Sequence, residues 1–293
     1  MKKYKYVLLK ILTSLLFIYI IFSEVGVGDF LDSFRITNPK LIITVFILFF
    51  VNYFLSGIKG KILLIHQSGK VDLKYLIYLY FTGSFFNNFM PTIIGGDVYK
   101  VYKLSQKIGN HDNALSVIVM GRIISLLVLI FISIISIMLN IGLWGAILLF
   151  LYLILLVIVF YIFSFFSHKI ELFRKIYNIL SFYKGHKLVI IKALSLSLIV
   201  QTIYILIQYY IFKIIGVDLS LSFAFLVLPI IRFIGFFIPS TNGFGVQDLL
   251  YIKIFYFAGI AGVVSLWASV IYHLFKFLVS LVGGFLYALD KDD

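Results

Sequence analysis

The sequence contains no cysteine, few charged residues and only four prolines. Without cysteine the chain has no disulfide framework, no thiol nucleophile and no thiolate metal ligand. Charged residues make up 13% of the chain and hydrophobic residues 62%, whereas soluble domains average about 25% charged and about 45–50% apolar residues. This composition predicts an integral membrane protein.

Motifs of several enzyme classes are also missing. The sequence has no Walker phosphate-binding loop, no GxSxG nucleophile elbow and no HExxH metal motif, and no loop is long enough to fold into a catalytic domain. His66, His111, His168 and His186 lie near predicted loops and lack the spacing of metal ligands. The sequence therefore predicts no cofactor and no metal site.

Six long apolar runs predict membrane-spanning helices, because a span needs about 20 mostly apolar residues. The runs cover residues 7–22, 41–58, 115–139, 146–166, 193–214 and 265–288. The first follows a lysine-rich N-terminus, as in a signal peptide, but no good cleavage site comes after it. We therefore predict an uncleaved first span in an all-α polytopic membrane protein, with a single integral membrane domain over residues 1–293.

Two further apolar stretches, 75–90 and 221–238, lead directly into segments that break a helix. The breaking residues are Pro91, Gly95 and Gly96 in the first segment and Pro239, Gly243 and Gly245 in the second. Proline lacks the N–H that a helix needs, and glycine adopts backbone angles closed to other residues. Asp97 follows the first break, where it is predicted to cap the next helix.

The two breaks have matching surroundings. Asp97 follows the first and Asp248 the second, and in each case a basic side chain lies 25 residues further on, at Arg122 and at His273. Paired hydrophobic segments interrupted by glycine and proline are typical of transport sites between inverted repeats. The pattern predicts two related units; two unrelated helix-breaking loops are the alternative.

Positive charges guide the predicted topology. The formal net charge is +13, and lysine and arginine gather on the cytoplasmic side of a membrane, near anionic lipid. Lysines stand on both sides of the stretch 75–90, namely Lys59, Lys61, Lys70 and Lys74 before it and Lys100, Lys103 and Lys107 after it. A complete crossing would put one group outside, so a re-entrant hairpin is favoured.

We therefore predict six spans and two inverted re-entrant units, about 72–139 and about 221–288, in a multi-pass protein of the cell membrane with both termini cytoplasmic. Non-helical backbone at membrane depth occurs only where it is buried in protein or lines a wet cavity, so this geometry implies a site. If 221–238 instead crosses completely, the C-terminus lies outside. The basic loop 167–192 has apolar residues at helical spacing, which predicts an amphipathic helix on an anionic leaflet, with a solvated connector as the alternative.

Charged residues inside apolar runs are candidates for a binding site, because each costs about 2.5 kcal/mol or more at mid-membrane. The candidates are Asp97, Lys100, Arg122, Arg232, Asp248, His273 and Lys276. Together with two half-helix N-termini, the cations predict a pocket for a phosphate head group. In the alternatives, Asp97 only pairs with Lys100 or Arg122, Lys276 snorkels outward, or Asp97 and Asp248 hold Mg²⁺ on a pyrophosphate.

The chain resembles the flippase-like transmembrane module of lysylphosphatidylglycerol synthases, a family also found as stand-alone membrane proteins. The residues that carry the resemblance are Pro91-Thr-Ile-Ile-Gly95-Gly96-Asp97 with Lys100, Gly121-Arg122, and Pro239-Ser-Thr-Asn-Gly243-Phe-Gly245-Val-Gln247-Asp248. The family tends to have arginine in place of Lys100 and Gln247, glutamate in place of Asp248, and more glycine in the second break. The resemblance covers nearly the whole chain.

The resemblance implies a transporter that binds and translocates an anionic lipid, such as aminoacylated phosphatidylglycerol, another phospholipid or a polyprenyl-phosphate glycolipid. The alternatives are a membrane enzyme of lysylphosphatidylglycerol synthesis or lipid-linked glycosyl transfer, and a subunit that serves a separate lipid-modifying transferase. Bifunctional relatives carry a cytosolic domain after the membrane part, whereas this chain stops at Asp293, so synthase activity is not expected. A nucleic-acid partner is not expected either, because the chain has no soluble basic module.

Overall fold

The computed structural model describes residues 39–64, 71–88, 95–141, 171–238, 243 and 245–290, with a few positions between 147 and 165. These residues form helices and short connections, without strands. Of the predicted features, the span 7–22 and the prolines Pro91 and Pro239 lie outside the described residues, as does most of the span 146–166.

Four described helices are long and apolar enough to cross a membrane: α3 (Pro39–Leu63), α6 (His111–Ile141), α9 (Lys187–Ile214) and α12 (Gly262–Leu289). At about 1.5 Å per residue, each is longer than the roughly 30 Å hydrocarbon core of a bilayer. They confirm the predicted spans 41–58, 115–139, 193–214 and 265–288. The chain is therefore an all-α membrane protein with several spans.

The lipid-facing surface is visible on α3. Large apolar side chains stand exposed along this helix, among them Ile43 and Ile47, each more than half exposed, and Phe54. The opposite face of α3 buries Val45 and Phe49 against the rest of the bundle. In a bilayer the exposed side chains contact acyl chains, so they incur none of the cost that they would in water.

The first break separates two short antiparallel helices, α4 (Leu73–Asn87) and α5 (Gly95–Ile108). The Tyr75 hydroxyl at the start of α4 donates to the Lys103 carbonyl near the end of α5 at 3.0 Å, and the Gly96 amide donates to Asn87 Oδ1 at 2.6 Å. At about 1.5 Å per residue each helix is only roughly 20 Å long, too short for the hydrocarbon core. The chain therefore turns back after the first half of the hairpin.

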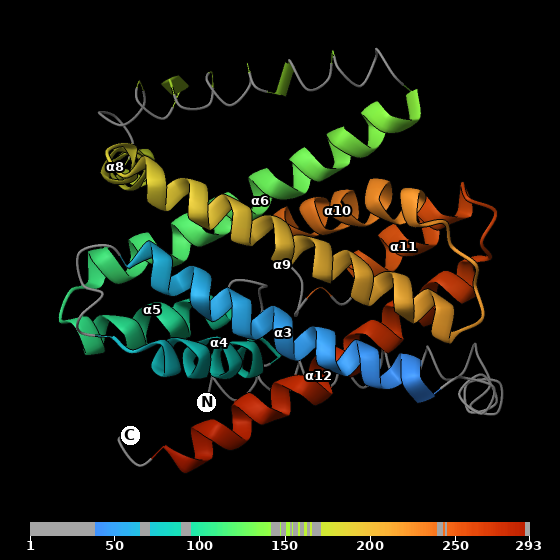
Figure 1. Cartoon of the computed structure of the whole chain (residues 1–293), viewed down its shortest axis with the longest axis horizontal. Coiled ribbons are helices and arrows are strands. Elements are labelled where there is room, and N and C mark those ends of the chain that lie inside the picture. The colour runs from blue at the N-terminus through green and yellow to red at the C-terminus, as the bar shows by residue number, and fades with distance from the viewer. Residues whose placement is uncertain are drawn as a thin grey trace, which may run out of the picture.

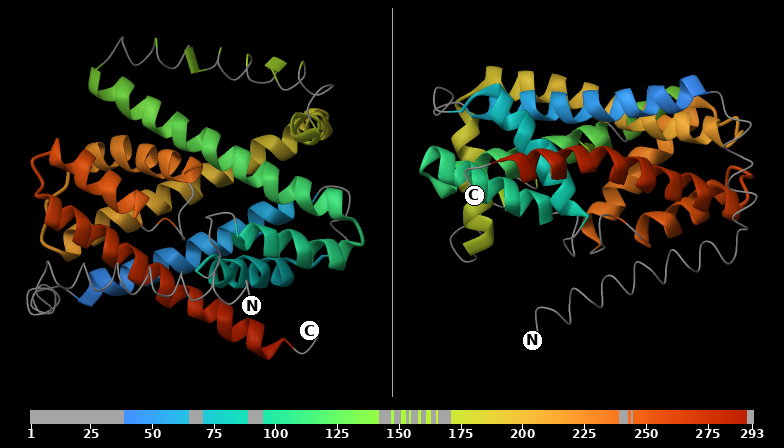
Figure 2. Two further views of the ribbon diagram at one scale, coloured as in Figure 1. Left: turned by 180° about the vertical axis from the view of Figure 1, so that it is seen from behind. Right: turned by 90° about the horizontal axis from the view of Figure 1, so that it is seen from below.

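The second break lies between α10 (Leu221–Phe237) and α11 (Val246–Tyr256). Figure 1 shows the α4–α5 hairpin at one end of the molecule and the α10–α11 hairpin at the other, and the view from behind in Figure 2 agrees. The packing of the two hairpins is similar: α4 packs against α12 and α10 against α6, while α5 packs against α6 and α11 against α12. The first helix of each hairpin therefore packs on the long helix of the other unit, and the second helix packs on the long helix that follows it.

Glycine allows the closest of these helix contacts. A Cβ atom on Gly96 would lie 2.0 Å from the Gly83 carbonyl oxygen, and one on Gly283 would lie 2.0 Å from the Phe81 carbonyl oxygen. In the second break, Gly243 and Gly245 have φ angles of 98° and 81°, which favour glycine. Backbone therefore touches backbone where α4 meets both α5 and α12.

The basic loop contains α8 (Glu171–Lys184), so the prediction of a helix there is confirmed. Tyr183 is buried and its hydroxyl donates to the Leu63 carbonyl at 2.9 Å, which fixes the end of α8 to the end of α3. On the exposed face Lys175 lies 2.8 Å from Glu171 and holds the pKa of that carboxyl below its usual range. The helix has an apolar, docked side and a charged side.

Candidate anion-binding site

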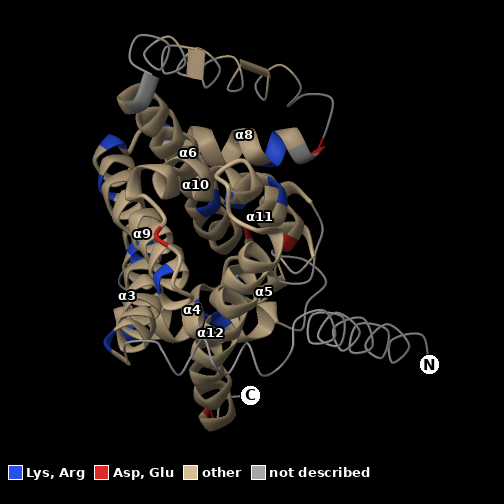
Figure 3. Ribbon diagram, turned by 90° about the vertical axis from the view of Figure 1, so that its right-hand side faces the viewer, with Lys and Arg blue, Asp and Glu red and all other residues tan. Residues whose placement is uncertain are grey.

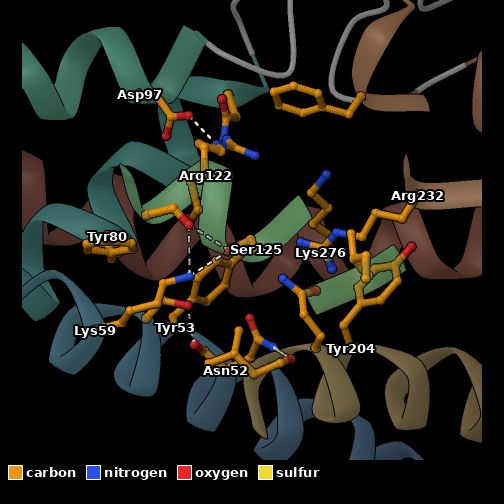
Figure 4. A pocket seen from close by; sticks show the side chains of 18 of the residues that line it. Asn52, Tyr53, Lys59, Tyr80, Asp97, Arg122, Ser125, Tyr204, Arg232 and Lys276 are labelled. Atoms are coloured by element: carbon orange, nitrogen blue, oxygen red, sulfur yellow. Dashed lines mark hydrogen bonds and ion pairs between the residues drawn. The ribbon is translucent and has the colours of Figure 1, made fainter. Parts of the chain in front are cut away.

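A cavity of about 180 Å³ lies where the long helices and both hairpins meet. Five cationic side chains line it, and they come from five different helices: Lys59 (α3), Lys100 (α5), Arg122 (α6), Arg232 (α10) and Lys276 (α12). Asp97 is the one carboxylate among its described lining residues. Figure 4 shows Lys59, Asp97, Arg122, Arg232 and Lys276 around a common space.

Asp97 binds two of the cations. Arg122 Nε donates to Asp97 Oδ2, and Lys100 Nζ lies 2.5 Å from Oδ1. The Asp97 side chain is only 6% exposed. The structure therefore confirms that Asp97 pairs with both predicted partners. The capping prediction is wrong, because α5 begins at Gly95 and Asp97 is its third residue, with its carboxylate bound to two cations.

Lys59 is the residue that sequence reasoning placed wrongly. The sequence predicts this lysine in the cytoplasmic loop after the run 41–58, but the residue is only 4% exposed inside α3. Lys59 Nζ donates to Ser125 Oγ at 2.7 Å and to the Gly121 carbonyl at 3.3 Å, both on α6. The helix continues five residues beyond the predicted apolar run 41–58, to Leu63, because α6 receives the ammonium group.

Arg232 and Lys276 lie on the other side of the cavity from Asp97 in Figure 4. The Arg232 guanidinium stacks over the Tyr204 ring at 3.7 Å from its centroid, and Lys276 Nζ is 5.8 Å from the Tyr272 ring centroid. Among the described residues no carboxylate forms an ion pair with Arg232. Because Lys276 lines the cavity, the alternative that it snorkels outward is wrong.

Neutral polar side chains complete the wall, and of those described next the sequence singled out only Gln247, through the family resemblance. Asn52 Nδ2 donates to the Val200 carbonyl at 2.8 Å, and Gln201 Oε1 is buried without a hydrogen-bond partner in the described part of the chain. Gln247 fits against Gly235 and Gly243, whose missing side chains leave room for it. Gln201 had a usable signal, a polar residue in the middle of an apolar span.

The other two predicted site residues lie outside this cavity. Asp248 Oδ2 accepts the Gly245 amide at 2.8 Å, while Oδ1 accepts Ser269 Oγ at 2.5 Å and lies 3.4 Å from His273 Nε2. Neither Asp248 nor His273 lines the cavity. Asp97 and Asp248 therefore belong to separate clusters, and this geometry does not support the Mg²⁺ alternative.

The two acid–base pairs that share a spacing of 25 residues in the sequence are also in contact in the structure. Asp97 contacts Arg122, and Asp248 contacts His273, each across 25 positions of sequence. In both units the acid is on the helix after the break and the base on the following long helix. No group of three or more His, Asp or Glu side chains among the described residues is placed to hold a metal ion.

The remaining basic residues of α5 lie at the surface. Lys103 and Lys107 line a wider groove of about 480 Å³ beside Tyr75, Tyr78 and Asp290. The three lysines of α5 are thus divided, because Lys100 lines the cavity and the other two do not. Figure 3, viewed from one end of the molecule, shows more basic than acidic residues along the helices.

Apolar helices of spanning length around a buried, cation-lined cavity define a multi-pass α-helical membrane protein with an internal polar site. Residues 7–284 match the family model described as the lysylphosphatidylglycerol synthase TM region, and the chain belongs to this family. The match confirms the resemblance seen in the sequence and relates the protein to membrane lipid metabolism. A comparison with curated proteins finds no match.

Proposed function

We propose that the protein binds the head group of an anionic lipid in the central cavity and carries it across the membrane. The observation that carries this proposal is the charge of the cavity, where five cationic side chains face a single carboxylate. Uncompensated charge in a protein interior is costly, and a bound anion offsets part of that cost. Arginine suits a phosphate in particular, because its planar fork can donate two parallel hydrogen bonds.

The size of the cavity supports a head group as the part of the lipid that is bound. Pockets that enclose a whole drug-sized ligand usually measure about 300–1,000 Å³, and this cavity measures about 180 Å³. The acyl chains therefore stay in the bilayer. Candidate substrates are aminoacylated phosphatidylglycerol, another phospholipid and a polyprenyl-phosphate glycolipid, and a separate lipid-modifying transferase is a candidate partner.

The proposed architecture has six spans and two re-entrant hairpins of opposite orientation, with the cavity between them. The short hairpins at opposite ends of the molecule support it, as do the equivalent packing of α4 with α12 and of α10 with α6. Helix termini that meet near mid-membrane are a known arrangement of transport sites. An enzyme remains the competing class, but the separation of Asp97 from Asp248 gives it no support.

Arg232→Ala tests the proposal most directly. Arg232 has no carboxylate partner among the described residues, so removing its side chain leaves no buried carboxylate without an ion-pair partner. We expect lipid binding to weaken by about 1.5–3 kcal/mol, the range for hydrogen bonds to charged groups, and lipid movement to fall accordingly. The measurement is movement of a fluorescent anionic lipid in vesicles that contain the purified protein. Arg174→Ala, at an exposed position of α8, is the matched control.

Arg122 provides a second test, since lysine keeps its charge but loses the forked geometry. We expect Arg122→Lys to slow lipid movement in the same vesicles. Normal movement by well-folded Arg122→Ala and Arg232→Ala proteins would exclude a phosphate site in the cavity.

A further inference from the structure

We infer that the head group taken by this cavity carries two negative charges and no ammonium group, as in a phosphomonoester or a diphosphate. The inference rests on the proposed function and narrows it. It separates the candidate lipids by charge, because phosphatidylglycerol carries one negative charge and its lysyl ester has a net positive charge.

The charge balance leaves more than one positive charge for a ligand. Asp97 neutralises one charge, yet both Arg122 and Lys100 contact it. Lys59 has only a hydroxyl and a carbonyl as hydrogen-bond partners among the described residues, and Arg232 has an aromatic ring. A buried lysine can lose its proton, but a guanidinium cannot, so the two arginines keep their charge in any case.

The cations are also distributed in a way that suits two anionic groups. In Figure 4, Arg122 lies beside Asp97 on one side of the space, and Arg232 and Lys276 lie together on another. Lys59, on α3, adds a further cation and donates to Ser125 of α6. A monoanion satisfies one side only, whereas a diphosphate or a doubly charged phosphate presents enough oxygens for both.

The charges that line the cavity disfavour an ammonium group. The one described carboxylate of the cavity already contacts two cations. Two of the lining rings already carry the protein's own cations: Lys100 lies 4.5 Å from the Tyr80 ring centroid, and Arg232 lies 3.7 Å from that of Tyr204. A lysyl ester would add two ammonium groups beside like charges, which is unfavourable.

The test compares lipids with identical acyl chains that differ in head-group charge. Purified full-length protein in detergent is titrated with phosphatidic acid, phosphatidylmethanol, phosphatidylglycerol and lysylphosphatidylglycerol. Phosphatidylmethanol differs from phosphatidic acid by one methyl group and one charge, so it is the sharpest comparison. We expect phosphatidic acid to bind at least ten-fold more tightly than phosphatidylmethanol, and lysylphosphatidylglycerol to bind more weakly than phosphatidylglycerol.

Each outcome has a separate meaning. Equal affinity for phosphatidic acid and phosphatidylmethanol, or tightest binding of lysylphosphatidylglycerol, would overturn this inference and leave the proposed lipid site intact. Failure of all four lipids to bind would overturn the proposed function as well. Inorganic pyrophosphate is the non-lipid probe: we expect it to displace phosphatidic acid only at higher concentration, and pyrophosphate binding as tight as phosphatidic acid would assign the site to a free anion.

The Lys59→Met substitution tests whether the charge of Lys59 contributes to the preference for a doubly charged head group. The change removes the charge and leaves an unbranched side chain one atom shorter, and Ser125 Oγ retains its bond to the Gly121 carbonyl at 2.8 Å. We expect the preference for phosphatidic acid over phosphatidylmethanol to fall at least three-fold, whereas Lys103→Met, in the surface groove, keeps the wild-type preference. An unchanged preference in folded Lys59→Met protein would remove Lys59 from the site and contradict the two-charge inference.

Discussion

Asp97 forms ion pairs with two cations on one side of the cavity and so partly neutralises them. Its two oxygens contact different cations, Arg122 through Oδ2 and Lys100 through Oδ1. Arg122 belongs to the next helix, α6, and Lys100 to the next turn of α5 itself. The carboxylate therefore joins α5 to α6 while it also lowers the charge that faces a ligand.

The Asp97→Asn substitution tests this role. It leaves two buried cations without a carboxylate, and breaking a buried pair in this way costs about 3–5 kcal/mol. We expect Asp97→Asn to be destabilised by that amount, and Arg122→Ala to lose less, because Lys100 still pairs with Asp97. The measurement is unfolding of the purified proteins in detergent. Asp112→Asn, at an exposed position of α6, is the control; equal stability of wild type and Asp97→Asn would contradict the role.

Cavity-lining residues could be predicted where the sequence places a single charged residue inside an apolar run. Arg122 and Arg232 are of this kind, and both line the cavity. Lys59 was missed because it directly follows an apolar run, where a lysine usually marks the membrane surface. Its burial depends on Ser125 and the Gly121 carbonyl of another helix, and a single sequence does not reveal which helices meet.

At the scale of the helix, α4 is held on two sides by glycine contacts. It meets α12 at Gly283 and α5 at Gly96, with carbonyl oxygens of α4 in the space where a side chain would begin. Such close approach lets helices pack in a membrane without a hydrophobic driving force. The short α4 therefore has little freedom to shift.

Gly283→Ala is expected to destabilise the protein by about 1–3 kcal/mol or more, the usual cost of overpacking, because the new Cβ would lie 2.0 Å from backbone oxygen. Gly121→Ala, also inside a long helix, would meet only Leu63 Cδ1 at 3.5 Å. It should be neutral or stabilising by up to about 1 kcal/mol, since alanine favours helix more than glycine does. Thermal unfolding of both variants in detergent measures the difference; similar unfolding temperatures would show that α4 and α12 can separate at little cost.

The element types and their order were predictable, but their ends were less so. Composition identified the four described spans, and the glycine-rich break after residue 90 identified a hairpin, since lysines on both sides of a short apolar stretch oppose a full crossing. The helices extend further than the apolar runs; α9, for example, begins at Lys187 and not at 193. Exposed polar residues such as Lys187 and Lys192 continue the helix beyond the apolar run, so hydropathy alone does not locate the end of a helix.

For the whole molecule, the prediction that remains to be tested is its orientation. We expect Lys103 and Ser181 to face the cytoplasm and Asn140 and Asp218 to face the outside. Because the chain contains no cysteine, single cysteine substitutions at these positions can be labelled in intact cells with an impermeant reagent. Labelling from outside at Asp218 and Asn140 only is the expected result. Labelling at Lys103 from outside would show that the first hairpin crosses the membrane.

The charge of the cavity also has an electrical consequence. Moving one elementary charge across a membrane potential changes its energy by about 2.3 kcal/mol per 100 mV. The described lining residues hold five formal positive charges and one negative charge, and a bound dianion cancels half of the excess. The empty and loaded forms of the protein therefore respond differently to voltage. For the transport function that we propose, the membrane potential is therefore the expected energy source.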